Sequence, residues 1–218
     1  MKLKKGEEVF NAEGEKIGTL ERVVIDPQTR AVTHIVVEKG WLFSTNKVIS
    51  MSEIDTERED KLVVTSRRED PDEFPAFEES HYVNLDQNDQ PHTDVGSVFW
   101  YPPANLAWWR AGAAYMGYYP PIPNYAVRTT HNIPEGMIAL EEGAKVISKD
   151  EQHVGNIEQV IVDPEDNRAT HFVIRGGLFS KRKLLPVLWI SHIDEKEIHL
   201  SVNSVLLERL PEYQAEAR

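Results

Sequence analysis

The sequence predicts an all-β fold, in which two small antiparallel β-barrels follow one another along the chain. One pattern of short β-branched segments occurs twice at a nearly constant spacing. Turn residues separate these segments at short intervals, as in small barrels. Between the copies lies a segment of different composition, rich in aromatic residues and proline. The predicted architecture is therefore barrel, connector and barrel, with a short helix at the end of each barrel.

The repeat is visible residue by residue. Matching residues recur 137 positions apart: Gly6, Val9, Gly18, Glu21, Val23, Asp26, Pro27, Thr33 and His34 return as Gly143, Val146, Gly155, Glu158, Val160, Asp163, Pro164, Thr170 and His171. Each copy also closes with an apolar residue, proline, any residue and an aromatic residue, at positions 74–77 and 210–213. We divide the chain into a first repeat (residues 1–77), a connector (78–135) and a second repeat (136–218).

Within each repeat the pattern predicts short strands. Residues 20–25 and 31–38 are expected to form a hairpin around Asp26-Pro27, because Asp and Pro suit the first two positions of a type I turn. The second repeat has the same hairpin around Asp163-Pro164. Gly18 and Gly155 indicate a bulge or a close backbone approach in an earlier hairpin. Further strands are predicted at residues 47–51, 61–65, 184–188 and 197–202, and Ser204 is predicted to cap a helix that ends before Pro211.

The connector contains 10 of the 19 aromatic residues and 7 of the 13 prolines. A flexible spacer would have fewer aromatic residues. One interpretation is that the connector packs over both barrels and joins them into one unit. The other is that it forms a recognition surface for a partner protein or a membrane interface. For the second interpretation, the candidate residues are Trp100, Trp108, Trp109, Tyr115, Tyr118 and Tyr119, and residues 104–115 are compatible with a short helix.

The charge distribution argues against a nucleic-acid-binding protein. The formal net charge is −12, and the first repeat, the connector and the second repeat each carry −4. Nucleic acid binding depends on Lys and Arg side chains that displace counterions from phosphates. The one basic cluster is the loop at residues 178–183, which is either a solvated loop or a contact for phosphate or an acidic partner. Its candidate residues are Leu178, Phe179, Lys181, Arg182 and Lys183.

Catalytic and metal-binding motifs are absent from the sequence. There is no cysteine, no histidine spacing typical of a helical zinc site, no phosphate-binding glycine loop and no nucleophile elbow. His34 and His171 occupy equivalent strand positions and are expected to be structural. Acidic pairs such as Glu7-Glu8 and Glu141-Glu142 are expected to be solvated. We therefore expect no catalytic residues, no bound metal, no cofactor and no enzymatic activity.

Neither a secretory signal nor an apolar run of about 18 residues is present. The chain is therefore expected to be soluble and cytoplasmic, without a transmembrane segment, which agrees with the lack of cysteine. The partner is expected to be another protein, and peripheral contact with a membrane stays compatible with the sequence. The oligomeric state is left open.

The two copies resemble the PRC-barrel domain. The resemblance rests on residues 16–18, 23–27 and 33–37 with the Gly-Leu-Phe loop in the first repeat, and on residues 154–155, 163–164, 170–173 and 184–186 in the second. It covers about 160 residues and leaves the connector unexplained. PRC-barrels occur in the cytoplasmic domain of the photosynthetic reaction centre H subunit and in the C-terminal domain of a ribosome maturation factor, and the barrel itself is not catalytic in either.

The resemblance implies a fold and a mode of action. We expect a non-catalytic adaptor or scaffold that binds another protein through barrel faces and the connector. One alternative is an accessory protein of a photosynthetic or electron-transfer membrane complex, although the chain lacks the transmembrane helix of the H subunit. The other alternative is a module that binds a small ligand or a metal between the barrels.

Overall fold

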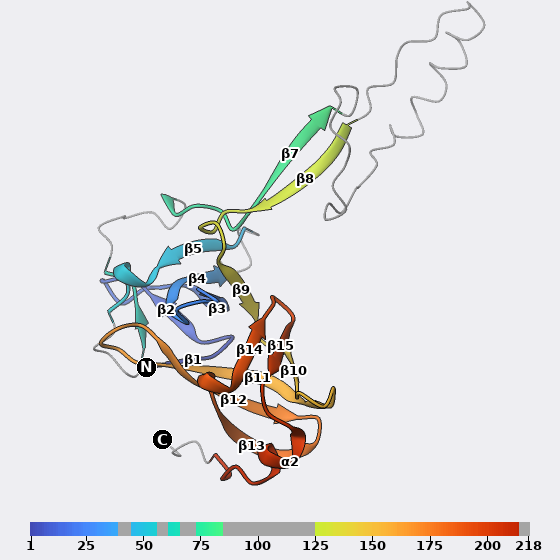
Figure 1. Cartoon of the computed structure of the whole chain (residues 1–218). Helices are drawn as coiled ribbons and strands as arrows, with labels where there is room; N and C mark the ends of the chain where they lie inside the picture. Colours follow the sequence, from blue (N-terminus) through green and yellow to red (C-terminus); the bar gives the residue numbers. More distant parts are fainter. Residues whose placement is uncertain (39–44, 56–60, 66–72, 85–124, 214–218) are drawn as a thin grey trace, which may run out of the picture. The chain divides into compact units, whose positions relative to one another are not determined.

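The computed structural model describes residues 1–38, 45–55, 61–65, 73–84 and 125–213 (Figure 1). The chain divides into two compact units. Unit 1 contains Met1–Phe77 and Asn132–Arg218, and unit 2 contains Glu78–His131. Both repeats thus belong to unit 1, whereas unit 2 corresponds to most of the connector.

The first repeat forms one sheet with the strand order β5-β4-β3-β2-β6. A 3₁₀ turn, η1, follows β5 directly. The elements are β2 (Glu8–Phe10), β3 (Lys16–Ile25), β4 (Val32–Glu38), β5 (Lys47–Ser50), η1 (Met51–Glu53) and β6 (Leu62–Val63).

The second repeat forms a sheet with the equivalent order, β13-β12-β11-β10-β15-β14. Here too a 3₁₀ turn, η3, follows the fourth strand. The elements are β10 (Lys145–Ile147), β11 (His153–Val162), β12 (Ala169–Gly176), β13 (Phe179–Pro186), η3 (Val187–Trp189), β14 (Ile190–Ile193), β15 (Glu197–Leu200) and α2 (Ser204–Glu208).

The mostly β fold with two equivalent sheets is confirmed, but the strand pairing is not wholly antiparallel. In each repeat one pair is parallel, β2 with β6 and β10 with β15. The predicted strands correspond to described strands, except that Met51 belongs to η1 and residues 187–188 belong to η3. Among the described residues, no pairing joins the two ends of either strand order, so the pairing does not run around a closed ring.

The predicted hairpins are present, and the first residue of each turn stabilises it. The carboxylate of Asp26 accepts hydrogen bonds from the backbone N–H of Gln28 at 2.8 Å and from the hydroxyl of Thr29 at 2.7 Å. Arg30 then adopts a left-handed conformation with φ of 62°. The equivalent Asn167 has φ of 56°, so the turn is built alike in both repeats. The hydrogen bonds of Asp26 also lower the pKa of its carboxyl, first of all the bond from Thr29.

Gly18 marks a close approach, as predicted. A Cβ atom at this position would lie 2.5 Å from the carbonyl oxygen of Glu38 on the neighbouring strand β4. The register between β2 and β3 shifts beside it, between Val9 and Phe10. Any larger residue would therefore push β3 and β4 apart.

The helix α2 is capped differently from the prediction. Ser204 is its first residue rather than its cap, and the preceding Asn203 makes no capping bond with its side chain. Instead, the carboxylate of Asp150 accepts bonds from the backbone N–H and the hydroxyl of Ser204, at 2.8 and 2.7 Å. A hydrogen bond from the side chain of Ser148, followed by these two bonds from Ser204, lowers the pKa of Asp150 strongly. The cap therefore joins α2 to the β10–β11 hairpin, and Leu207 of the helix is fully buried.

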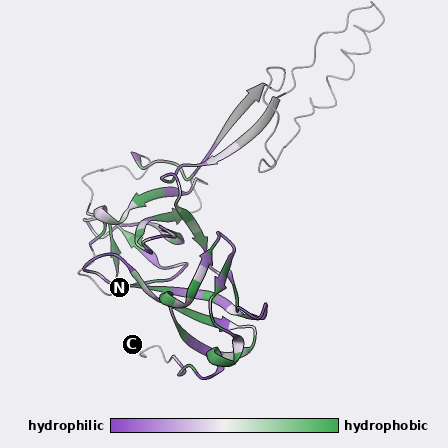
Figure 2. Ribbon diagram, viewed as in Figure 1, coloured by the Kyte–Doolittle hydropathy of each residue, from purple (hydrophilic) through white to green (hydrophobic). Residues whose placement is uncertain are grey.

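The core of unit 1 is shared by the two repeats. One cluster of buried residues runs from Leu3, Val9 and Leu20 in the first repeat to Phe172, Leu185 and Leu207 in the second. Figure 2 shows hydrophobic residues gathered along the strands of both sheets. A smaller cluster surrounds the buried Phe77. Because apolar burial is the main favourable term in folding, the two repeats are expected to fold together.

The closing segments of the two repeats dock in the same way, which agrees with their common sequence pattern. Ala76 bridges to Lys47, and Glu212 bridges to the equivalent Lys183. The lysine ammonium groups donate to carbonyl oxygens of these segments, Lys47 to Phe74 at 3.1 Å and Lys183 to Leu210 at 2.5 Å. Each closing segment therefore covers the edge strand of its own sheet, β5 or β13.

Unit 2 is an antiparallel ribbon of two strands, β7 (Glu78–Asn84) and β8 (Tyr125–His131). Its register is regular from the pair Glu78–His131 to the pair Asn84–Tyr125. The residues from 85 to 124 connect the two strands at the end of the ribbon. The predicted helix at 104–115 and the candidates Trp100, Trp108, Trp109, Tyr115, Tyr118 and Tyr119 lie outside the described residues.

Candidate functional site at the junction of the repeats

The two repeats exchange their first strands. β1 (Lys2–Leu3) belongs to the first repeat but pairs with β11 of the second. β9 (Ile138–Glu141) belongs to the second repeat but pairs with β3 of the first. Figure 1 shows β1 beside β11 and β9 beside β3. The sequence analysis assigned neither strand.

The two exchanged strands pair with equivalent residues of the other repeat. Leu3 pairs with Val160, and its equivalent Leu140 pairs with Val23, the equivalent of Val160. Leu3 and Leu140 are 1% and 2% exposed. Each exchanged strand thus places one leucine in the common core and covers a strand edge that would otherwise be open to pairing with another chain.

The long strands β3 and β11 explain how the exchange is accommodated. Each has ten residues, and its first half pairs with the neighbouring strand of its own repeat. Its second half pairs on the same side with the strand from the other repeat. The own-repeat partners, β2 and β10, are only three residues long. Because β2 and β10 are shorter than β3 and β11, the second half of each long strand has a free edge, with which the exchanged strand pairs.

The hairpin turns form a second contact between the repeats. Ala31 bridges to its own equivalent, Arg168. On either side, Val32 N–H donates to Asn167 O at 2.8 Å and Ala169 N–H donates to Arg30 O at 3.0 Å. Residues at equivalent positions therefore meet where the two turns touch.

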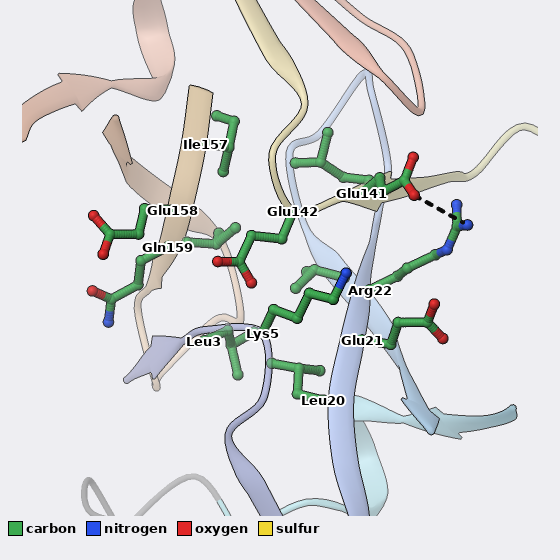
Figure 3. A pocket seen from close by; sticks show the side chains of 13 residues that line it. Leu3, Lys5, Leu20, Glu21, Arg22, Glu141, Glu142, Ile157, Glu158 and Gln159 are labelled. Atoms are coloured by element: carbon green, nitrogen blue, oxygen red, sulfur yellow. Dashed lines mark ion pairs between the residues drawn. The ribbon is translucent and has the colours of Figure 1, made fainter. Parts of the chain in front are cut away.

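A small cavity lies between the exchanged segments (Figure 3). It is about 20 Å³ in volume, which is room for about one water molecule. Lys5 and Glu142 line it, and these two residues occupy equivalent positions in the two repeats. Arg22 of β3 and Glu158 of β11 line it as well. Lys5 and Glu142 also line a shallow pocket of about 550 Å³, together with Arg175.

Charged pairs across the junction hold the exchanged segments. Arg22 lies 3.7 Å from Glu141, and Lys4 lies 4.0 Å from Glu158. Glu158 also accepts a two-pronged hydrogen bond from Arg182, with the Nε contact at 2.6 Å. The bond from Arg182 is the main reason that the pKa of Glu158 lies below its ordinary value, although burial opposes it.

Two polar atoms at the cavity lack hydrogen-bond partners among the described residues, Arg22 Nε and Glu142 Oε2. Burial raises the pKa of the Glu142 carboxyl. The backbone N–H and the ammonium group of Lys5 lower it, as does Lys4, and Glu158 raises it. A buried carboxylate oxygen without a partner normally bonds to water, and the cavity has room for one. The acidic pair Glu141-Glu142, expected to be solvated, is in fact half-buried at the junction.

Glu142→Gln is expected to raise the thermal midpoint at pH 7. The folded form has the higher pKa, so ionisation of Glu142 costs stability at neutral pH, and this cost disappears as the pH falls towards 4.5. Glutamine resembles the protonated acid, so parent and variant should converge in that pH range. Calorimetry at a series of pH values measures this, with the exposed Glu165→Gln as control. A midpoint at pH 7 below that of the parent would contradict it.

The basic loop proposed as a contact site has partners within the chain. Lys181 lies 2.7 Å from Glu212, Arg182 binds Glu158, and Lys183 donates to the carbonyls of Glu208 and Leu210. Leu178 is 48% exposed, and Phe179 begins β13. The prediction of a solvated loop is therefore wrong for residues 179–183, which belong to strand β13. Binding of a partner here stays a prediction.

The histidines in the described part of the chain are not grouped into a candidate metal site. Within the described ranges, no three His, Asp or Glu side chains are grouped closely enough to hold a metal ion. His34 is half-buried on β4, with Nδ1 3.0 Å from Thr33 Oγ1. Burial lowers its pKa, while Glu53 raises it. His192 and His199 lie opposite each other on β14 and β15, with ring centres 6.3 Å apart.

One signal in the sequence could have located the junction. Extending the 137-residue spacing back to the start of each repeat aligns Lys4-Lys5 with Glu141-Glu142 and Leu3 with Leu140. The leucines are the same, whereas the charges are opposite. Two adjacent reversed charges next to a shared leucine mark these segments as the ones to compare across the repeats.

Comparison with known proteins agrees with this architecture. The family model of the PRC-barrel domain matches twice, at residues 5–71 and 142–207, which together exceed half of the chain. No curated protein matches the chain. In the part of the chain that the structure describes, no helix has the length and apolar character needed to span a bilayer. With two matches in sequence and two equivalent sheets in structure, the chain belongs to the PRC-barrel domain family as a tandem PRC-barrel protein.

Proposed function

We propose that this protein is a non-catalytic adaptor, in which unit 1 is a scaffold and the connector is the segment that recognises another protein. The observation that carries the proposal is that the two repeats join directly through β1, β9 and a common core. The contact between the barrels therefore needs no connector. This direct contact between the repeats supports a recognition role for the aromatic residues of the connector over a role in joining the barrels.

The connector leaves and re-enters unit 1 at one place. Phe77 N–H donates to Asn46 O at 2.7 Å, and Asn132 N–H donates to Phe77 O at 2.8 Å. Phe77 itself is fully buried, and Arg22 lies over its ring at 5.4 Å. From this anchored point the chain continues into the ribbon of β7 and β8. Topologically, the connector is an insertion in one folded unit.

The residues between β7 and β8 have the composition of a recognition segment. Trp100, Trp108 and Trp109 fall between Asn84 and Tyr125, together with five further aromatic residues. Trp and Tyr are enriched among the few residues that dominate binding energy in protein interfaces, because they bury large surfaces at low entropic cost. The proposed partner is accordingly a protein. The proposed place of action is the cytoplasm, which agrees with the absence of cysteine.

The proposal predicts that Trp108→Ala with Trp109→Ala abolishes capture of a stable partner from the host and leaves the β-sheet signal in circular dichroism unchanged. A second variant replaces residues 85–124 with an Asn-Gly turn, which suits a two-residue connection between Asn84 and Tyr125. It should be folded and equally unable to capture the partner. Affinity capture followed by mass spectrometry measures both.

The outcomes separate the two interpretations of the connector. If either variant unfolds, the connector is part of the core and the proposed recognition role is wrong. If both variants fold and still capture the same partner, recognition depends on barrel faces instead. Leu188→Ala is a suitable control, because Leu188 is 80% exposed on unit 1 and the proposal gives it no role.

A further inference from the structure

The exchanged segments of the two repeats differ in charge at equivalent positions. Lys4 and Lys5 in the first repeat correspond to Glu141 and Glu142 in the second. The neighbouring positions are the same or similar, with Leu3 matching Leu140 and Gly6 matching Gly143. Opposite charges also occur elsewhere, as at Glu8 and Lys145, but Lys4, Lys5, Glu141 and Glu142 are the reversed charges that lie where the chain crosses from one repeat to the other.

These charges face complementary groups in the assembled unit. Glu141 faces Arg22 of the first repeat at 3.7 Å, and the guanidinium side chain is 15% exposed. Lys4 faces Glu158 of the second repeat at 4.0 Å, and that carboxylate side chain is 17% exposed. Lys5 and Glu142 line the same cavity, and Lys5 acts electrostatically on Glu142 (Figure 3).

A junction between two identical repeats would lose this complementarity. If a first repeat paired with another first repeat, Lys5 would meet a second Lys5. Lys4 would lie beside Arg22 and Glu21, which take the places of Gln159 and Glu158. If a second repeat paired with another second repeat, Glu142 would meet a second Glu142, and Glu141 would lie beside Glu158. Like charges in such positions destabilise a sheet contact. Their partial burial weakens the screening that solvent gives.

We propose that the junction is a selective interaction surface, on which the exchanged segment of one repeat accepts only a repeat with the opposite charge at the equivalent positions. The partner that fits the first repeat is therefore the second repeat, in the same chain or in another copy of it. Specificity arises here mainly from repulsion in the wrong pairings. The half-buried Glu142 costs stability, so its charge contributes to the choice of partner rather than to net stability.

The test is a double-mutant cycle in the intact chain, with Lys5→Glu, Glu142→Lys and the two combined. Lys5→Glu places two carboxylates at the cavity and Glu142→Lys places two ammonium groups there. Each single variant should lower the folding equilibrium constant by about threefold to fivefold, measured by urea unfolding at low salt. The combined variant restores opposite charges and should return the urea midpoint close to that of the parent. The coupling free energy between positions 5 and 142 should be smaller at 0.5 M salt, because salt screens the charges.

Matched controls separate this effect from a change in net charge. Lys149→Glu and Glu13→Lys make the same changes at exposed positions away from the junction, and they should leave the midpoint almost unchanged. Glu142→Gln removes the charge without adding repulsion, so it should be more stable than Glu142→Lys. If the combined variant loses as much stability as the two single variants together, the proposal is wrong. The same holds if the junction variants behave like their controls.

Discussion

Leu140→Ala is expected to lower the free energy of unfolding by about 2–5 kcal/mol, the range for a buried leucine in a well-packed core. Leu140 is 2% exposed and belongs to the second repeat, but it packs in the sheet of the first repeat opposite Val23. Its loss should therefore destabilise both repeats. Leu3→Ala should act in the same way from the other side, because Leu3 is 1% exposed and pairs with Val160.

Native-state hydrogen exchange shows whether the destabilisation is shared. The amides of β4 in the first repeat and β12 in the second should lose the same amount of protection in Leu140→Ala. Leu188→Ala is the matched control, because Leu188 is 80% exposed and its loss should change stability by less than about 0.5 kcal/mol. Loss of protection in only one repeat would mean that the repeats fold independently.

Much of the fold could be predicted from the sequence because its signals are local. The hairpin at Asp26 combines a β-branched strand, a turn residue with a carboxylate and a second β-branched strand. Gly18 stands where only a hydrogen atom fits beside Glu38. Because these signals occur twice in the same order, they also indicated the PRC-barrel family. These features depend on residues a few positions apart.

The features that the sequence analysis missed depend on distant residues. β1 and β9 have two and four residues, which is too short for an alternation pattern. The residues of β1 pair with residues 157 and 159 positions away, and those of β9 with residues 113 to 119 positions away. Nothing in a strand's own sequence tells whether it pairs within its repeat or across to the other. The cap of α2 is similar, because Asp150 lies 54 residues before Ser204. The parallel pair of β2 and β6 leaves no local signal either.

The candidate binding residues can be divided in the same way, into those predicted from local composition and those that depend on distant residues. Composition singled out the aromatic connector and the basic loop, because unusual residue types are visible without a fold. The junction could not be assigned in this way, since Glu141 and Glu142 resemble any other acidic pair on a surface. Only the alignment of the two repeats reveals their opposition to Lys4 and Lys5.

Ala31→Cys with Arg168→Cys is expected to form a disulfide between the two repeats. The two residues form an antiparallel bridge without mutual hydrogen bonds, since the flanking bonds run between Val32 and Asn167 and between Ala169 and Arg30. The Cα atoms of such pairs lie within the range that a disulfide spans. Arg168 is exposed, and its guanidinium lies 3.5 Å from the carboxylate of the nearby Asp166, so little packing is lost. Closing so long a loop should stabilise the fold by about 5 kcal/mol on the chain-entropy relation.

The chain has no cysteine of its own, so the pair can be observed without background. A protease site placed within residues 85–124 then allows the two repeats to be separated after oxidation. Direct contact between the repeats predicts a single full-size band after cleavage on a non-reducing gel, and two fragments after reduction, whereas Ala31→Cys alone gives two fragments in both gels. If the double variant keeps two free thiols and runs as two fragments without reductant, the repeats do not meet at their turns and the account of a single exchanged unit is wrong.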